Sequence, residues 1–350
     1  MDPTLDSECR LVTRRRTGHY LFMVATFVAL AAFPVGAVVP QSPEINRASV
    51  ERVISVLAHD GMEGRSAFSP AALRAAEFIA SEFDSIGLDE VSGNDGYLQH
   101  FNARRRGRGR RGGGQTDTEQ TEYGLSNVVG MIAGNRTDEY VVFSAHYDHI
   151  GIRPGGDDVI ANGANDNASG TTAVIELARY FNSQSKPERT LLFVAFTAEE
   201  SGGLGSRYFS EQLDPDNIVA MFNIEMIGKP AVSGPNTAWI TGFERSSFGE
   251  ILQRAVEDTQ YEFYADPYPE QNLFFRSDNA TLARLGVPAH SISTTPIDVD
   301  PDYHQVTDHV DTLDLDHMTE TIRAIAMAGE PIISGAETPT RVDPSSVRRR

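Results

Sequence analysis

The side chains best suited to chemistry begin with a histidine and an aspartate that follow an apolar run at residues 140–145. His146 and Asp148 are two residues apart, so one imidazole nitrogen can bind a metal ion while the carboxylate orients the other nitrogen. This spacing is common by chance and is weak evidence alone. Asp166 lies in a second polar segment, residues 163–170, before an expected helix. An aspartate there is typical of a helix N-cap, but its two oxygens can also bridge two metal ions.

Two adjacent glutamates, Glu199 and Glu200, follow another apolar run at residues 191–196. Neighbouring carboxylates that leave a buried strand repel each other unless cations or protons lie between them. One of the two can therefore bind a metal ion while the other remains free to act as a base.

A third glutamate and a second histidine complete the set. Glu225 ends the apolar segment 218–224, where burial of a charged side chain without a partner is costly, so we expect a metal ion or an ion pair beside it. Tyr303 and His304 precede Asp308 and Asp311, a pattern that is also typical of a solvated loop.

Taken together, these segments supply imidazole and carboxylate groups and no thiolate, because the single cysteine, Cys9, lies near the N-terminus. Nitrogen and oxygen ligands of this kind suit zinc. The candidate metal ligands are His146, Asp166, Glu200, Glu225 and His304.

With these motifs, and with Met62-Glu63-Gly64-Arg65, Arg276-Ser277-Asp278 and Gly286-Val287-Pro288, residues 50–325 resemble family 28 of the metallopeptidases, the di-zinc aminopeptidases. The resemblance implies two Zn²⁺ ions. It places one ion on His146 and Glu225 and the other on Glu200 and His304. Asp166 would bridge them, with a cis peptide bond to Asn167.

The resemblance also implies that the chain removes N-terminal residues from peptides. Glu199 would be the general base, Asp148 would orient His146, and the Tyr303 hydroxyl would stabilise the oxyanion. The chain departs from many relatives at two positions. Glu225 stands where they carry Asp. Asn279 stands where they often carry His, and we expect this second difference to change substrate contacts only.

Three other functions remain open on the same scaffold. A carboxypeptidase or dipeptidase needs a basic group for a terminal carboxylate, and Arg276 is the candidate substrate-binding residue that offers one. A glutaminyl cyclase of related fold would use one zinc ion. A non-catalytic binding protein would not need Glu199 together with all five ligands.

Short β-rich segments alternate with helical ones after the first two expected helices. This alternation predicts an α/β fold with a largely parallel sheet covered on both faces. The family resemblance implies the zinc-exopeptidase form of this fold, with three α/β/α layers around a central mixed, largely parallel sheet. The expected strands lie at 127–133, 140–145, 190–197, 218–224, 237–241 and 287–293. The expected helices lie at 45–58, 71–86, 168–182, 203–213, 246–258, 277–285 and 315–328.

Composition indicates how the chain divides into an N-terminal segment, a central domain and a C-terminal segment. Three arginines at 14–16 precede the apolar residues 20–39, so residues 1–39 are typical of an export signal or signal anchor. We expect an exported protein, in the periplasm, outside the cell or anchored with the enzyme facing outward, that touches a membrane only through this segment if it is not cleaved. Residues 40–334 would form the peptidase domain, with an Arg/Gly-rich loop at 103–115, and residues 335–350 a flexible tail.

The formal net charge of −19 makes nucleic acid an improbable partner. The expected partner is a peptide substrate. Neither the oligomeric state nor the preferred substrate side chain is indicated by any motif.

Overall fold

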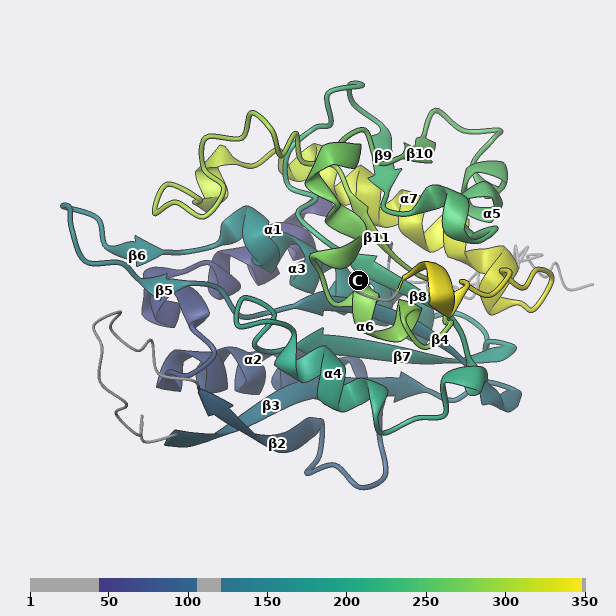
Figure 1. Ribbon diagram of the computed structural model, residues 1–350, viewed down its shortest axis with the longest axis horizontal. Helices are drawn as coiled ribbons and strands as arrows, with labels where there is room; N and C mark the ends of the chain where they lie inside the picture. The colour runs from purple at the N-terminus through teal and green to yellow at the C-terminus, as the bar shows by residue number, and fades with distance from the viewer. Residues whose placement is uncertain (1–43, 106–120, 348–350) are drawn as a thin grey trace, which may run out of the picture. The chain divides into compact units, whose positions relative to one another are not determined.

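The computed structural model describes residues 44–105 and 121–347, and the fold outlined below concerns these residues (Figure 1). The expected export segment and residues 106–115 of the expected Arg/Gly-rich loop lie outside them. No helix within the described ranges is long and apolar enough to cross a membrane.

The strands of the main sheet are β1 (Asp89–Glu90), β2 (Leu98–Arg105), β3 (Thr121–Ile132), β4 (Arg136–His146), β7 (Arg189–Phe196), β8 (Ile218–Ile224), β9 (Thr237–Ile240), β10 (Glu262–Ala265) and β11 (Ala289–Ser293). β5 (Gly151–Ile152) and β6 (Ile160–Ala161) pair separately. The α-helices are α1 (Arg47–Leu57), α2 (Pro70–Ile86), α3 (Gly170–Asn182), α4 (Leu204–Ser210), α5 (Phe248–Ala255), α6 (Asn279–Ala283) and α7 (Leu315–Ile333).

Single turns connect these elements. The 3₁₀ turns are η1 (Asp60–Arg65), η3 (Pro215–Asn217), η4 (Phe243–Arg245), η5 (Pro269–Gln271), η6 (Leu273–Phe275), η7 (Val310–Thr312) and η8 (Pro344–Ser346). η2 (Ala164–Ser169) is a π-type turn that leads into α3.

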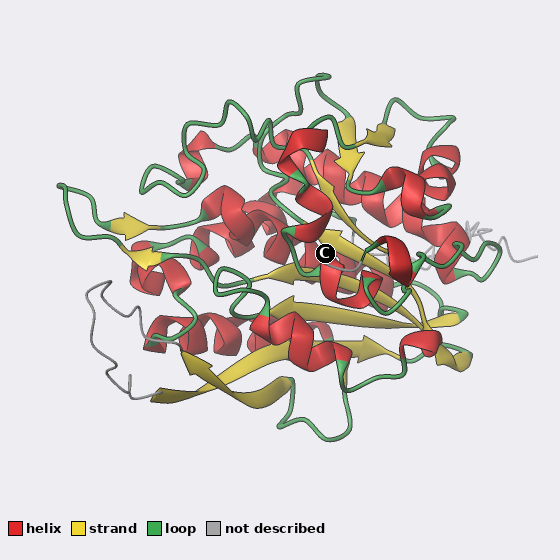
Figure 2. Cartoon of the chain, in the orientation of Figure 1, coloured by secondary structure: helices red, strands yellow, loops and turns green. Residues whose placement is uncertain are grey.

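The main sheet has the order β1-β3-β7-β4-β8-β11-β9-β10, and β2 pairs with the outer part of β3. The central strands β7, β4, β8 and β11 run parallel, whereas β3 and β9 pair with this block in antiparallel fashion. Helices cover both faces, with α1, α2, α3, α5 and α7 on one side and α4 and α6 on the other (Figure 2). The predicted three-layer α/β fold with a mixed, largely parallel sheet is therefore confirmed.

Local sequence explains why these elements form where they do. β7 is buried along its whole length, as expected for a continuous apolar run in a parallel sheet covered on both faces. α2 ends at Gly87, whose φ of 83° is a left-handed conformation that glycine adopts without steric cost. α7 begins after Asp314, whose side chain accepts a hydrogen bond from the His317 backbone N–H.

Two features of the sheet differ from the sequence prediction. The prediction did not include the outer strands β1, β2 and β10, and it began β3 at residue 127 instead of Thr121. The outer half of β3 contains polar and exposed residues. Its extended conformation therefore depends on pairing with β2 and not on burial.

The C-terminal segment also differs from the prediction of a flexible tail. Residues 335–347 pack against the α4–α6 face, where Val342 and Val347 are buried. The Arg341 guanidinium donates to the Ile218 carbonyl at 2.9 Å, and Arg189 donates to the Glu337 carbonyl at 2.7 Å. The prediction was wrong because the segment has no periodicity of its own, and its order comes from contacts with distant strands.

A buried arginine connects the turns that follow β4 and β6. Arg65 is fully buried and donates four hydrogen bonds to backbone carbonyls, those of Leu57, Tyr147, Asn162 and Gly163, at 2.6–2.8 Å. Burial lowers the pKa of Arg65 to about 10, which leaves the guanidinium charged at neutral pH. Arg65 therefore holds the main chain directly after His146 and shortly before Asp166.

Gly64 explains another position of the motif that contains Arg65. A Cβ at this residue would lie 2.4 Å from the Ala161 carbonyl oxygen and 2.8 Å from the Gly151 Cα, so any side chain would push the β5–β6 hairpin away. Its φ of 64° is also unfavourable for other residues. The Gly-Arg pair thus packs η1 tightly beneath these turns.

We expect Arg65→Lys to lower the free energy of unfolding by about 3 kcal/mol or more, because one ammonium cannot replace a planar guanidinium that donates to four separated carbonyls. Urea denaturation followed by circular dichroism measures this loss. Arg74→Lys is the matched control, since Arg74 is exposed and donates only to the Gly61 carbonyl and Glu63. Equal losses in the two variants would contradict the role given to Arg65.

Candidate metal centre

The candidate ligands meet at the carboxyl ends of the central parallel strands. His146 is the last residue of β4, Glu200 follows β7 by four residues, and Glu225 directly follows β8. Asp166 lies in η2, and His304 lies in the loop between β11 and η7. Parallel strands end at the same edge of a sheet, so this arrangement brings together residues that are far apart in the sequence.

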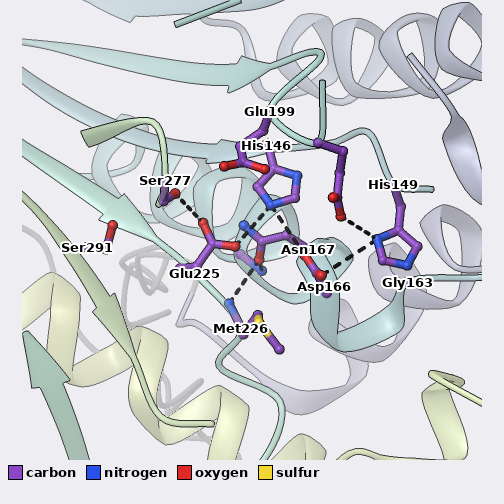
Figure 3. Close-up of polar contacts among 12 residues, drawn as sticks. His146, His149, Gly163, Asp166, Asn167, Glu199, Glu225, Met226, Ser277 and Ser291 are labelled. Carbon is purple, nitrogen blue, oxygen red and sulfur yellow. Dashed lines mark hydrogen bonds and ion pairs between the residues drawn. The ribbon is translucent and has the colours of Figure 1, made fainter. Parts of the chain in front are cut away.

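One group of potential ligands contains His146, Asp166 and Glu225. His146 Nε2 lies 3.0 Å from Glu225 Oε1 and 3.4 Å from Asp166 Oδ1 (Figure 3). Glu225 Oε2 accepts a hydrogen bond of 2.6 Å from the Ser277 hydroxyl, which fixes the carboxylate. The three ligand atoms are close enough to one another to hold a single metal ion.

A second group uses the other oxygen of Asp166. His304 Nε2 lies 3.1 Å from Asp166 Oδ2 and 3.3 Å from Glu200 Oε1. Asp166 thus presents Oδ1 to one group and Oδ2 to the other, which is the geometry that a bridging carboxylate requires. All five ligands predicted from the sequence converge, and they do so as two groups that share one aspartate.

The loop around Asp166 is held from several sides. The Asp308 carboxylate accepts hydrogen bonds from the backbone N–H groups of Asn165 and Asp166, at 2.8 and 3.0 Å. The Asn167 side chain accepts from the Met226 N–H at 3.1 Å and donates to the Ile224 carbonyl, which joins the loop to the end of β8. The peptide bond between Asp166 and Asn167 is cis, as the family resemblance implied.

Asp148 is placed differently from the sequence interpretation. The His146 Nδ1 atom lies 3.0 Å from the Asp148 backbone carbonyl, whereas the Asp148 carboxylate is 3.8 Å away. The carboxylate instead accepts a hydrogen bond of 3.0 Å from the Glu199 backbone N–H. Asp148 therefore orients His146 mainly through its main chain and positions Glu199 through its side chain.

The electrostatic environment reflects this concentration of acidic groups. Burial raises the pKa of Glu199 well above its usual range, and the nearby carboxylates of Asp278 and Glu225 add to the effect against the opposing influence of His146. Burial alone would raise the pKa of Asp166, but hydrogen bonding with His146 and His304 lowers it well below its usual value. Glu199 thus has the raised proton affinity of a base, and Asp166 stays ionised.

The donor set fits zinc on the basis of its chemistry and spacing. Two ligand atoms of one tetrahedral zinc ion, each about 2.0–2.2 Å from it, lie roughly 3.3–3.6 Å apart. The separations within the two groups are 3.0–3.4 Å, and several buried carboxylates in one place need compensating positive charge. His146 and Glu225 would hold one ion, Glu200 and His304 the other, with Asp166 between them.

The two groups line a cavity of about 820 Å³ that also contains Glu199, Arg276 and Tyr303. The Tyr303 ring stacks on the His304 ring with centroids 4.0 Å apart, and Arg276 donates to the Tyr303 hydroxyl at 3.3 Å. Every site residue selected from the sequence except Asp148, which is buried behind the site, therefore lines this cavity.

Asn279 does not behave as expected from the sequence. It is fully buried, donates to the carbonyls of Phe274 and Ala289, and accepts from the Ser291 hydroxyl. It is not among the residues that line the cavity. The prediction that this position affects substrate contacts is wrong, because the side chain points into the packing between α6 and β11.

Sequence reasoning missed two residues that the structure brings to this centre. His149 lies beside Glu200 and Asp166, and Asp308 supports the Asp166 loop. His149 directly follows Asp148 and lies three residues after His146. This cluster of three ionisable residues was the signal that could have identified His149. Asp308 was noted only as a member of an acidic stretch, and nothing in that stretch specifies a contact with residue 166.

Comparison with solved structures supports the fold. The solved structure of BSAP, a zinc aminopeptidase from Bacillus subtilis, is similar over 85% of this chain and 97% of its own, with a TM-score of 0.67 and 17% identity. A glutaminyl cyclase from Bacteroides thetaiotaomicron bound to N-acetylhistamine is also similar, with a TM-score of 0.61 and 17% identity over 85% of this chain and all of its own. At these identities the likeness establishes the fold alone.

Proteins that are similar in sequence include leucine aminopeptidases. A probable leucine aminopeptidase of Trichophyton verrucosum is 28% identical over 59% of this chain and 57% of its own length, and leucine aminopeptidase 1 of Metarhizium robertsii is 27% identical over 55% and 51%. The chain thus matches just over half the length of these relatives. The sequence pattern of peptidase family M28 matches residues 127–329, which include every candidate ligand, and the chain belongs to this family.

Proposed function

We propose that the chain is a zinc-dependent exopeptidase that uses two Zn²⁺ ions to remove residues from the N-termini of peptides. The observation that carries the proposal is the pair of ligand groups that share Asp166 beside a carboxylate that is free of both groups, Glu199. The names of the relatives, leucine aminopeptidase and zinc aminopeptidase, support the same reaction.

When bound, the zinc ions would supply Lewis acidity, which lowers the pKa of the attacking water towards neutrality. Glu199 takes a proton from the attacking water and returns it to the leaving amine. Its backbone N–H bonds to Asp148, which holds the carboxylate in place for both transfers. The Tyr303 hydroxyl, fixed between His304 and Arg276, donates to the developing oxyanion.

The cavity beside the ligands suits an uncharged N-terminal side chain. Its wall includes the apolar residues Met226, Trp239, Leu273, Phe275 and Ile297. Burial of a leucine-sized side chain against such a wall contributes roughly 1.5–3 kcal/mol. The carboxylates of the centre, Glu225 among them, favour a positively charged α-amino group over a terminal carboxylate.

A carboxypeptidase or dipeptidase remains the second candidate because Arg276 lines the same cavity. Its guanidinium already donates to Gln271 at 2.9 Å and to Tyr303 at 3.3 Å, so it is engaged within the protein. This pairing favours a supporting role for Arg276 over capture of a substrate carboxylate.

A panel of chromogenic peptides tests the proposal directly. We expect cleavage of leucyl and other apolar aminoacyl anilides with a free amine, no cleavage of their N-acetylated forms, and loss of all activity with a chelator. Metal analysis of the purified protein should give two zinc ions per chain. Cleavage confined to C-terminal residues would identify the second candidate, and a single zinc ion would contradict the two-ion site.

We expect Glu199→Gln to reduce kcat about 10²- to 10⁴-fold while zinc content stays unchanged, because the amide keeps the shape of the side chain but cannot accept the proton. Asp166→Ala is the contrasting variant and should lose zinc as well as activity. Turnover and metal content are measured on the same preparations. A Glu199→Gln variant with near wild-type kcat would show that another group is the base.

We also propose that the protein is exported. Support comes from residues 14–16 and 20–39, a basic triplet followed by an apolar stretch. N-terminal sequencing of the protein recovered from each cell fraction tests this, and full-length protein confined to the cytoplasm would contradict it.

A further inference from the structure

His149 is a buried histidine beside the centre to which the family resemblance gave no role. The residue is 1% exposed, and within the described part of the chain neither ring nitrogen has a hydrogen-bond partner. A buried imidazole without partners is costly, because it has lost its water and gained nothing in exchange. A ligand on at least one nitrogen would offset this cost.

The Nδ1 atom of His149 points into the second ligand group. It lies 3.1 Å from Glu200 Oε1 and 3.8 Å from Asp166 Oδ2, and Figure 3 shows His149 facing Asp166. Glu200 Oε1 is likewise buried without a hydrogen-bond partner, so these two close atoms are not aligned for a hydrogen bond with each other. Two lone-pair atoms at this separation instead match a pair of ligands on one zinc ion, roughly 3.3–3.6 Å apart.

The surroundings leave the ring little freedom to turn away. Gly163 lies against it, and a Cβ at that residue would be 2.5 Å from His149 Cγ. The Arg65 guanidinium holds the carbonyls of Tyr147 and Gly163 on either side, and the His149 backbone N–H donates to the Arg65 carbonyl at 3.3 Å. These contacts confine the ring beside the second ligand group.

We propose that His149 Nδ1 is a fourth protein ligand of the zinc ion held by Asp166, Glu200 and His304. This inference rests on the proposed two-zinc site and goes beyond the ligands carried over from the family. It makes the two ions unequal, since the one held by His146, Asp166 and Glu225 keeps only three protein ligands. The three-ligand ion retains the open position of a catalytic site, and the four-ligand ion is held more firmly.

The first test compares zinc affinities by competition with a chromogenic chelator. We expect His149→Phe, which keeps a ring of similar size, to weaken the tighter of two zinc sites by at least about 10-fold and to leave the weaker site unchanged. His317→Phe is the matched control, because His317 is also buried with both ring nitrogens unpartnered but belongs to no ligand group among the described residues. Unchanged affinity of both sites in His149→Phe overturns the inference.

The second test needs no variant and decides the question if His149→Phe does not fold. X-ray absorption spectra of wild-type protein loaded with one equivalent of zinc report the ion in the tighter site. We expect about two imidazoles per zinc, from His149 and His304, whereas about one overturns the inference. Wild-type protein that binds no zinc would reject the proposed function itself, and protein that binds two ions with one imidazole each would reject only the role of His149.

Discussion

The position of one carboxylate, that of Asp166, is the constraint on which the rest of the centre depends. Each of its oxygens faces a different ligand group, so a shift of the side chain would disturb both groups at once. The residue is 2% exposed, so contacts with the protein and not with solvent set its position. Asp308 fixes the preceding N–H groups and Asn167 ties the loop to β8, so the bridge is built into the main chain.

The main electrostatic feature of this centre is a group of carboxylates buried close together. Carboxylates buried close together oppose folding unless cations or imidazoles lie between them, and here the ligand atoms alternate between imidazole nitrogen and carboxylate oxygen. Glu199 shares the charge but lies outside both ligand groups, and burial raises its pKa. The same environment that suits a metal ion therefore also raises the proton affinity of Glu199.

The residues that hold the candidate ligands in place and most of the residues that form the apolar wall of the cavity lie in different parts of the molecule. The ligands lie at the ends of β4, β7 and β8 and in turns held by Arg65, all of which depend on the buried sheet. Most of the apolar wall of the cavity instead comes from β9, η6 and the loop after β11, including Leu273 and Phe275, whereas Met226 adjoins Glu225. Residues that select the substrate can thus change without moving the ligands, since loops tolerate substitution better than the elements that support them.

Strong patterns in the sequence were enough to predict the layers of the fold and to select candidate ligands that converge in the structure. The apolar run of β7 and the polar residues that end β4, β7 and β8 carry that information locally, because a buried strand and a charged strand end each leave a mark in a few consecutive residues. The division of the five ligands into two groups came from the family resemblance, and the distances agree with it.

Tertiary structure alone decided the features that depend on distant contacts. The ordered packing of residues 335–347, the burial of Asn279 and the bonding of the Asp148 carboxylate to Glu199 all arise from segments that meet only after folding. His149 is the clearest case, since its sequence neighbours give no sign of where the ring points. The order of residues shows which side chains are available and on which elements they lie. Which atoms face each other depends on the folded chain, because contacts between distant segments set the direction of a side chain within a turn.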